Sequence, residues 1–268
     1  MPSDLHRQAL FVVPRAIIRK AIDEKDFTAL KAIHRINALT VCKSAEHGWI
    51  GASFSCMELL SMLHLFLGAD KVVLAKGHAA AAQYAVLYAD GVLSEEDLKN
   101  YKNGSLGLEA HADIDMDTGS LGMCLSSVAG MAAAQKGPAK YAVVLGDGEM
   151  QEGQCYEALM TIKKLKLTSV VPIIDQNNFQ SDNLCDEIMP IHDISTVLRG
   201  FGFEVLAING HDPHEISSAW KTATTADHRK SYVILAKTTK AGGTNLLKPS
   251  THPETGLLYH PWHTKVPK

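Results

Sequence analysis

The chain has 268 residues, of which 46% are hydrophobic and 21% charged, and a formal net charge of −3 at pH 7. This length accommodates one large α/β domain with a substantial core and does not require a second domain. The near-neutral charge, with lysines scattered among acids, argues against a surface for nucleic acid. No apolar stretch is long enough to cross a bilayer and the N-terminus lacks a signal-peptide pattern, so we expect a cytoplasmic protein without a membrane partner.

The five cysteines are odd in number and widely spaced. This pattern favours reduced thiols over a disulfide framework, as is usual for proteins of the cytosol.

Residues 1–20 are expected to form an N-terminal arm, ahead of a single domain over residues 21–268. Apolar residues at helical spacing predict a helix over Asp23–Ala45 and another over Cys56–Leu67. The short apolar run Val72–Leu74 predicts a strand, and the small residues from Ala79 onward open the next helix.

Two further helices are predicted before the middle of the chain. Ser94 is a favourable N-cap and is followed by three acidic residues, which suit the first turn of a helix over Ser94–Asn103. The second helix spans Ser126–Gln135.

The stretch from Tyr141 to Asp182 is the unit around which the chain is organised. Two apolar runs, Tyr141–Leu145 and Ser169–Ile174, read as buried parallel strands, and the segment between them reads as a helix. A right-handed βαβ unit places both post-strand turns at the same edge of the sheet, where open α/β sheets bind ligands.

The rest of the chain alternates helices and strands. We predict helices over Ile191–Arg199 and His214–Thr225, and strands over Phe203–Ile208 and Ser231–Lys237. The total of about five strands with intervening helices predicts an α/β fold with a doubly wound parallel sheet. His211 and His214 are interpreted as a loop and a helix start, because two histidines without further ligands are weak evidence for zinc.

The two turns of the central unit carry a carboxylate and an amide. If the strands are neighbours, about 4.8 Å apart, Asp147 and Asn177 supply oxygen ligands to one hard cation, Mg²⁺ or Ca²⁺. Gly148 allows close approach to the backbone, and a helix expected to begin just after it directs amide groups at a diphosphate. Either turn alone is commonplace, but the pair at this spacing indicates a metal-bridged diphosphate.

These residues carry a family resemblance. GDG, followed one βα unit later by NN, resembles the thiamine diphosphate motif, and GDGEMQEGQCYEALM with KLKLTSVVPIIDQNN is similar to its transketolase version. The resemblance runs from about Ala32 to the C-terminus and covers only the first, diphosphate-binding domain of a transketolase. It implies the thiamine-diphosphate-binding fold.

The resemblance also implies a role for particular residues. The metal ligands are the side chains of Asp147 and Asn177 and the carbonyl of Phe179. A catalytic role falls to His111, which contacts the donor sugar, to His263, and to Glu152 and Glu157, which communicate protons at the subunit contact. The full set of cofactor contacts is His78, Gly119, Leu121, Gly146, Asp147, Gly148, Asn177, Phe179 and His263.

The sequence departs from the family pattern beside the substrate. His47, Trp49 and His111 are expected to line the substrate pocket, and Trp49-Ile50 stands where the family has His-Pro. Either Trp49 takes the place of the usual histidine or His47 restores it. The segment Ser181-Asp182-Asn183 also differs from the family's apolar-Asp-Gly.

The activity implied is transfer of a two-carbon ketol unit from a ketose to an aldehyde by a split enzyme. This chain is expected to be the N-terminal subunit, active with a pyrimidine-binding C-terminal subunit in a heterotetramer of two plus two. The alternatives are a subunit of another thiamine-dependent carboligase or decarboxylase with a 2-oxo acid donor, and a cofactor-binding but catalytically silent assembly subunit. His78, His111 and His263 favour sugar chemistry.

Overall fold

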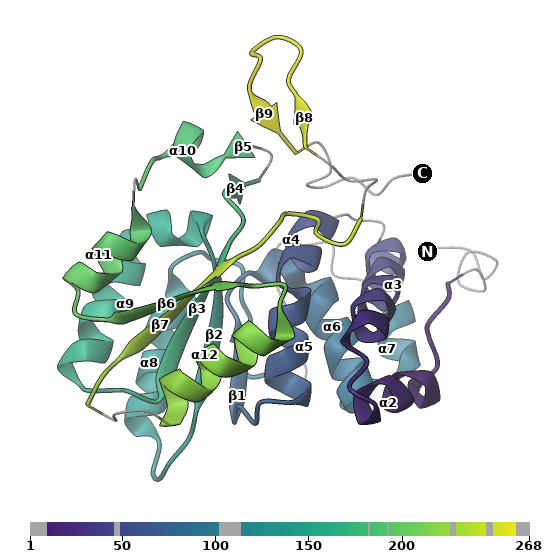
Figure 1. Cartoon of the computed structure of the whole chain (residues 1–268), viewed down its shortest axis with the longest axis horizontal. Coiled ribbons are helices and arrows are strands. Elements are labelled where there is room, and N and C mark those ends of the chain that lie inside the picture. The colour runs from purple at the N-terminus through teal and green to yellow at the C-terminus, as the bar shows by residue number, and fades with distance from the viewer. Residues whose placement is uncertain are drawn as a thin grey trace.

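The computed structural model describes residues 10–45, 49–101, 114–181, 183–191, 193–225, 229–244 and 249–260. Its centre is a five-stranded sheet in the order β1-β2-β3-β7-β6, with all neighbouring strands parallel (Figure 1). The strands span Lys71–Leu74 (β1), Tyr141–Gly146 (β2), Val170–Gln176 (β3), Glu204–Asn209 (β6) and Tyr232–Lys237 (β7). The predicted α/β class and the five predicted strands are therefore confirmed.

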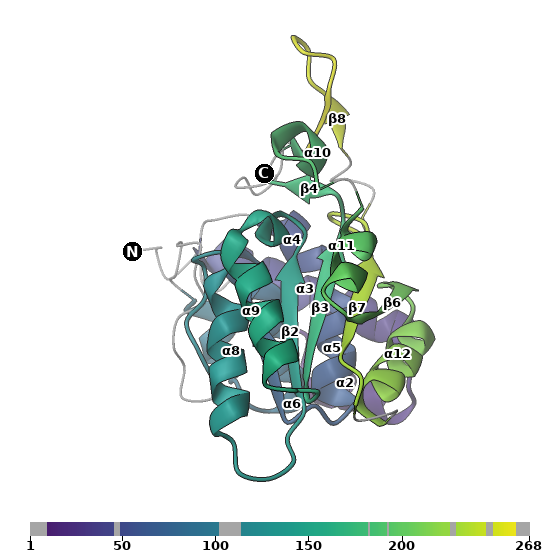
Figure 2. The same ribbon diagram turned by 90° about the vertical axis from the view of Figure 1, so that its left-hand side faces the viewer.

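Strands β2, β3 and β7 are buried on both faces, which explains why they are apolar runs rather than alternating patterns, whereas the edge strand β6 alternates in burial. Successive side chains of a strand point to opposite faces. Val72 and Leu74 accordingly belong to one hydrophobic core, and Val73 belongs to the other. The helices lie in a layer on each side of the sheet (Figure 2).

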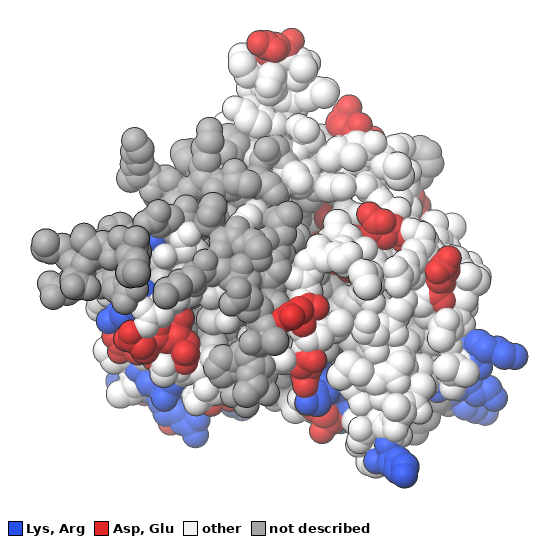
Figure 3. All heavy atoms as spheres, turned by 180° about the vertical axis from the view of Figure 1, so that it is seen from behind, with Lys and Arg blue, Asp and Glu red and all other residues white. Residues whose placement is uncertain are grey.

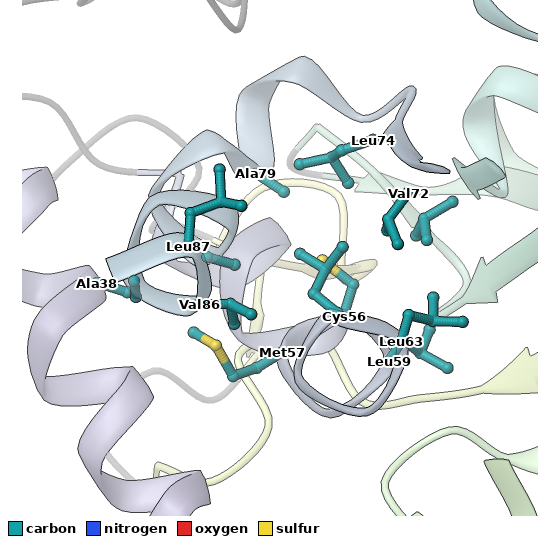
Figure 4. Close-up of a cluster of buried hydrophobic side chains, with 14 of the residues drawn as sticks. Ala38, Cys56, Met57, Leu59, Leu63, Val72, Leu74, Ala79, Val86 and Leu87 are labelled. Atoms are coloured by element: carbon teal, nitrogen blue, oxygen red, sulfur yellow. The ribbon is translucent and has the colours of Figure 1, made fainter. Parts of the chain in front are cut away.

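The larger core lies between the sheet and an extensive helical layer. Its packing is shown in Figure 4, where Leu59 and Leu63 of α5, Val86 and Leu87 of α6, and Val72 and Leu74 of β1 approach one another. The helices of this layer span Arg15–Asp23 (α2), Phe27–Ala45 (α3), Ile50–Ser55 (α4), Met57–Leu65 (α5), Ala80–Asp90 (α6), Glu95–Lys99 (α7) and Pro213–Thr225 (α12), with a 3₁₀ turn, Gly77–Ala79 (η1), before α6.

The smaller core covers the opposite face. It is formed by side chains from α8 (Met123–Ala134), α9 (Gly153–Lys164) and α11 (Ile194–Gly200).

Several helix ends differ from the predictions. The predicted helix from Asp23 begins at Phe27, because Lys25 has a left-handed backbone (φ 54°) and Asp26 accepts a hydrogen bond from the Ala29 amide as a cap. The helix predicted over Cys56–Leu67 is confirmed as α5, Met57–Leu65, but the short helix α4, Ile50–Ser55, which ends at Cys56 directly before it, was not predicted. The predicted N-cap at Ser94 is confirmed, with Asp97 completing a capping box.

The described residues that precede the predicted domain boundary pack onto the main domain. Val12, Val13 and Ile18 are buried in the larger core, and the domain boundary expected at residue 20 falls inside α2. All five cysteines are free thiols.

A second, smaller sheet was not anticipated from the sequence. Strands β4 (Phe179–Gln180), β5 (Asn183–Leu184), β8 (Ser250–Thr251) and β9 (Leu258–Tyr259) form an antiparallel sheet in the order β4-β5-β9-β8. Together with the short helix α10 (Cys185–Ile188) it stands above the carboxyl edge of the main sheet (Figures 1 and 2). Two-residue strands carry no periodicity, so the sequence gives no signal for them.

The surface carries charges of both signs. On the face shown in Figure 3, lysine, arginine, aspartate and glutamate side chains form small separate groups among uncharged residues. Among the described helices, none is long and apolar enough to cross a membrane.

Two buried imidazoles are expected to make stability depend on pH. His34 is fully buried on α3, and neither ring nitrogen has a hydrogen-bond partner among the described residues. Burial lowers the pKa of His34 to about 4, with Glu58 opposing and Arg35 reinforcing that shift. Burial likewise lowers the pKa of His64 to about 4. Both side chains therefore stay neutral in the folded protein while the unfolded chain takes up protons below about pH 6.5.

We predict that the free energy of unfolding falls as the pH decreases from 7 to 5, and that His34→Leu removes about 2 kcal/mol of that decrease. Urea unfolding at the two pH values measures this difference. The exposed His214, changed to Leu, is the matched control and should keep the wild-type dependence. An unchanged pH dependence in His34→Leu would contradict the prediction.

Candidate active site

The turns that follow β2 and β3 meet at the carboxyl edge of the sheet. The two strands are adjacent and parallel, and their register pairs Gly146 with Asp175. Asp147 and Asn177, which follow these positions, are thereby brought together as the sequence predicted. Both side chains lie among the residues that line one pocket.

The carboxylate of Asp147 is held by backbone amides. One oxygen accepts a hydrogen bond from the Gly148 amide at 3.0 Å, and the other accepts one from the Asn178 amide. Burial, together with the nearby Asp175, raises the pKa of Asp147 to about 6, although Lys76 and the two amides act in the opposite direction. A bound cation would favour the charged carboxylate, so this environment suits a metal ligand.

Asn177 is oriented equally well. It is 8% exposed, its side-chain oxygen accepts a hydrogen bond from the Phe179 amide at 3.0 Å, and its side-chain nitrogen lies 3.5 Å from the Ser55 hydroxyl. Asp147, Asn177 and Phe179 all line the same pocket, so a carboxylate and an amide oxygen lie within one short region. Oxygen ligands of this kind suit Mg²⁺ or Ca²⁺.

Gly148 is required by close packing. A Cβ atom at this position would lie 2.9 Å from Cγ of Gln180, closer than side chains allow. The prediction that a helix begins just after Gly148 is wrong: a 3₁₀ turn, Gly148–Gln151 (η2), comes first and α9 begins at Gly153. Glu152, with an extended backbone (ψ 128°) that no helix accommodates, separates η2 from α9.

The pocket has a volume of about 170 Å³. It is surrounded by the carboxyl ends of β1, β2 and β3 and by the turn after β7. Every predicted cofactor contact that the structure describes lies in its lining, which consists of Ala52, Lys76, His78, Gly119, Leu121, Gly146, Asp147, Gly148, Glu149, Asn177, Phe179, Gln180, Ser181 and Lys240.

The sequence analysis missed a buried ion pair at the base of this pocket. Asp175, fully buried at the end of β3, accepts hydrogen bonds from Lys76 and from the Ser55 hydroxyl at 2.6 Å. Thr238 donates to its other oxygen. Burial would lower the pKa of Lys76, but the charge of Asp175 outweighs that effect and raises it, so the lysine stays protonated. The sequence did contain one signal for Asp175, a charged residue near the end of an otherwise apolar strand.

Lys240 was also missed, because it lies in a turn far from the motif. It is 5% exposed, its ammonium group donates to the Ser181 carbonyl, and it lies 5.6 Å from the centre of the Phe179 ring. The pocket therefore receives a cation from the turn after β7 as well as from Lys76.

Glu149 is a third residue missed by the sequence analysis. One carboxyl oxygen accepts a hydrogen bond from the Gly122 amide at 3.1 Å, and the other has no hydrogen-bond partner among the described residues. Burial raises the pKa of Glu149 to about 7, partly offset by the amides of Gly122 and Gly146. Glu149 thus leaves one buried carboxyl oxygen in the pocket lining without a partner among the described residues.

The remaining predicted site residues that the structure describes are outside the pocket lining. Glu152 and Glu157 are exposed at the start of α9 and do not line the pocket. Trp49 precedes α4 with a left-handed backbone (φ 49°), which is strained for a bulky residue, and is also outside the lining. His47, His111 and His263 lie outside the described residues.

The donor set fits a cofactor with a diphosphate group. Among the described residues, no three His, Cys, Asp or Glu side chains come together as a metal site, so a cation beside Asp147 would need ligands from the amide, the backbone and the cofactor itself. Lys76 and Lys240 line the pocket and provide positive charge for an anion.

Fold and site together define a thiamine-diphosphate-binding protein. The family described as transketolase, thiamine diphosphate binding domain, matches residues 32–253. The chain belongs to this family. The predicted resemblance, and with it the expectation of a thiamine-diphosphate-dependent transferase, is confirmed.

The relatives include proteins of similar length. The chain is 34% identical over 208 residues to the 6-deoxy-6-sulfo-D-fructose transketolase subunit SqwG of Clostridium sp. (strain MSTE9), covering 70% of this chain and 76% of that one. It is 29% identical over 253 residues to an apulose-4-phosphate transketolase subunit of Phocaeicola vulgatus, covering 87% and 86%.

Longer transketolases match over a fraction of their length. Human transketolase is 37% identical over 185 residues, which are 65% of this chain and 29% of the human protein. The crystal structure of transketolase from Campylobacter jejuni is similar with a TM-score of 0.73 at 28% identity, covering 82% of this chain and 38% of that one. The chain therefore spans well under half the length of these two proteins.

We predict that Lys76→Met destabilises the protein by about 3–5 kcal/mol, because it leaves the buried carboxylate of Asp175 without its charged partner. Lys71→Met is the matched control, since its ion pair with Asp115 is solvent-exposed and is expected to contribute less than about 1 kcal/mol. Chemical unfolding of the two variants at pH 7 measures both quantities. Equal losses in the two variants would show that the Lys76 pair contributes little.

Proposed function

We propose that this chain is the N-terminal, diphosphate-binding subunit of a two-component transketolase. It would transfer a two-carbon ketol unit from a ketose donor to an aldehyde acceptor, with thiamine diphosphate and Mg²⁺ or Ca²⁺. The observation that carries this proposal is the convergence of Asp147, Asn177 and the Gly146–Gly148 turn in one pocket at the carboxyl edge of the sheet. Two relatives of similar length are named as transketolase subunits, which supports a split enzyme.

Thiamine diphosphate, when bound, supplies carbanion stabilisation to the reaction, and the protein supplies binding, orientation and electrostatics. In the proposal, Asp147, Asn177 and the Phe179 carbonyl hold the metal. Lys240 offers a charged donor to the diphosphate, because it lines the pocket and is held close to Phe179. His78, Gly119 and Leu121 line the same pocket and would lie against the cofactor, with His263 returning over it.

A second set of residues would act at the contact with the partner chain. Glu152 and Glu157 are both exposed on one short segment at the start of α9, so they are available to a neighbouring protein. Their exposure supports the proposed role in proton communication between sites in a heterotetramer of two plus two.

The substrate pocket is where the chain departs from the family pattern. His111 would contact the hydroxyl groups of the donor, and Trp49 or His47 would stand where the family has a histidine. A large, mostly apolar ring in place of an imidazole reduces selectivity for a hydroxyl group. The backbone of Trp49 is strained, and because such strain is concentrated at functional sites, it supports a functional role for this residue. We therefore propose a modified sugar as substrate in place of the ordinary pentose phosphates.

We predict that Asp147→Ala weakens the affinity for thiamine diphosphate in the presence of Mg²⁺ by at least about 10- to 100-fold. Loss of a residue that only hydrogen-bonds to a metal ligand typically has this effect, and Asp147 is proposed to be a ligand itself. The loss should nearly vanish when calorimetry is repeated in excess chelator, because the carboxylate acts through the cation. Asp186→Ala, which removes an exposed carboxylate on α10, is the charge-matched control. Unchanged affinity in Asp147→Ala would refute the metal site.

We predict that the purified chain has no transketolase activity alone and gains it when co-expressed with a pyrimidine-binding partner chain. Ketose phosphates, unphosphorylated ketoses, sulfonated ketoses and pyruvate are the donors to compare, against several aldehydes. Turnover of pyruvate alone would favour the 2-oxo acid alternative, and cofactor binding without turnover of any donor would favour the silent subunit. Efficient transfer from xylulose 5-phosphate to ribose 5-phosphate, undiminished in His47→Ala, would contradict the proposal that the segment around Trp49 selects a modified sugar.

A further inference from the structure

The turn that follows β7 brings Lys240 into the pocket and is fastened at both ends. Thr239 and Gly242 flank the lysine on either side, and each makes a hydrogen bond to a side chain from a distant segment. The backbone amide of Ala241 also donates to the Gly51 carbonyl at 3.0 Å. A lysine has a flexible four-carbon stem, so the position of its backbone determines the region that its ammonium group can reach.

His211 fastens the first end of the turn. Its Nε2 accepts a hydrogen bond from the Thr239 amide at 2.9 Å, and its Nδ1 lies 2.9 Å from Oε2 of Glu58. Because Nε2 is an acceptor, Nδ1 carries the proton and donates it to the carboxylate. The imidazole is therefore locked between Glu58 and the turn.

Arg35 fastens the second end. Its Nε donates to the Gly242 carbonyl at 2.8 Å, and one of its terminal nitrogens lies 2.8 Å from Oε1 of Glu58. The two oxygens of one carboxylate thus reach the two ends of the turn, one through each partner. Glu58 is 4% exposed, so its charge is satisfied by these partners rather than by water.

The fit between the turn and His211 is close. A Cβ atom at Gly242 would lie 2.8 Å from Cε1 of His211 and 2.9 Å from the Thr239 carbonyl, so no larger residue fits without moving the turn. Burial raises the pKa of Glu58, but hydrogen bonds from His211 and Arg35 outweigh it and hold the pKa below its ordinary value. The carboxylate consequently stays charged and keeps both partners engaged at neutral pH.

We propose that Glu58, through His211 and Arg35, is a positioning residue that holds Lys240 against the diphosphate of the cofactor. This inference rests on the proposed function, in which Lys240 donates to that diphosphate. None of the three residues lines the pocket, so each would act only through the turn.

A double-mutant cycle on the full chain tests this coupling. Calorimetry measures the affinity for thiamine diphosphate with Mg²⁺ in the wild type, His211→Phe, Lys240→Met and the double variant. His211→Phe should weaken binding by about 10-fold, the low end for a hydrogen bond to a charged group, and by less than twofold when Lys240 is already Met. Gly242→Ala disturbs the contact between the turn and His211 from within the turn and should behave alike, which provides a second variant should His211→Phe fail to fold.

Trp220→Phe is the matched control. It removes the 3.0 Å hydrogen bond from the indole to the Leu67 carbonyl in the same helical layer, away from the turn, and should leave the affinity unchanged. If His211 has a purely structural role, the double variant should lose as much affinity as the two single variants combined. This additive outcome would overturn the inference. So does unchanged affinity in both His211→Phe and Gly242→Ala.

The outcomes separate this inference from the proposed function. If the wild-type chain does not bind thiamine diphosphate, or if Asp147→Ala binds it as tightly as the wild type, both fail. If Asp147→Ala and Lys240→Met weaken binding but His211→Phe and Gly242→Ala do not, only the positioning role of Glu58 fails.

Discussion

The buried carboxylate of Asp175 joins the segments that surround the pocket. It lies at the end of β3 and is bound by Lys76 after β1, Ser55 at the end of α4 and Thr238 after β7. Because a buried charge without partners costs several kcal/mol, each of these segments must be in place for the carboxylate to be tolerated. One buried carboxylate, through three partners, thus sets the relative positions of four segments that are distant in the sequence.

Glu58 has a comparable role in the layer farther from the pocket. The turn after β7 contacts Asp175 through Thr238 and the partners of Glu58 through Thr239 and Gly242. Apolar burial on the two faces of the sheet stabilises the domain but is not directional. Directional hydrogen bonds to two buried acids are what determine where the cofactor-facing turns lie.

The order of elements was predictable because of a physical property of parallel sheets. Strands buried on both faces are continuous apolar runs, so Tyr141–Leu145 and Ser169–Ile174 were visible as strands and matched β2 and β3. Helix ends were less predictable, since the break at Cys56 and the 3₁₀ turn before α9 depend on contacts with other segments. The small antiparallel sheet was invisible because its strands are only two residues long and its two hairpins, β4–β5 and β8–β9, are distant from each other in the sequence.

The sequence by itself determined those features of the site whose chemistry is local. Gly146-Asp147-Gly148 and Asn177 lie in turns directly after apolar strands, so their meeting follows from the βαβ connection alone. Only the tertiary structure decided that Lys76, Glu149 and Lys240 complete the pocket and that Asp175 and Glu58 hold it together. These residues owe their roles to partners from other segments, and a carboxylate in a sequence does not show whether it will be exposed or buried against a distant cation.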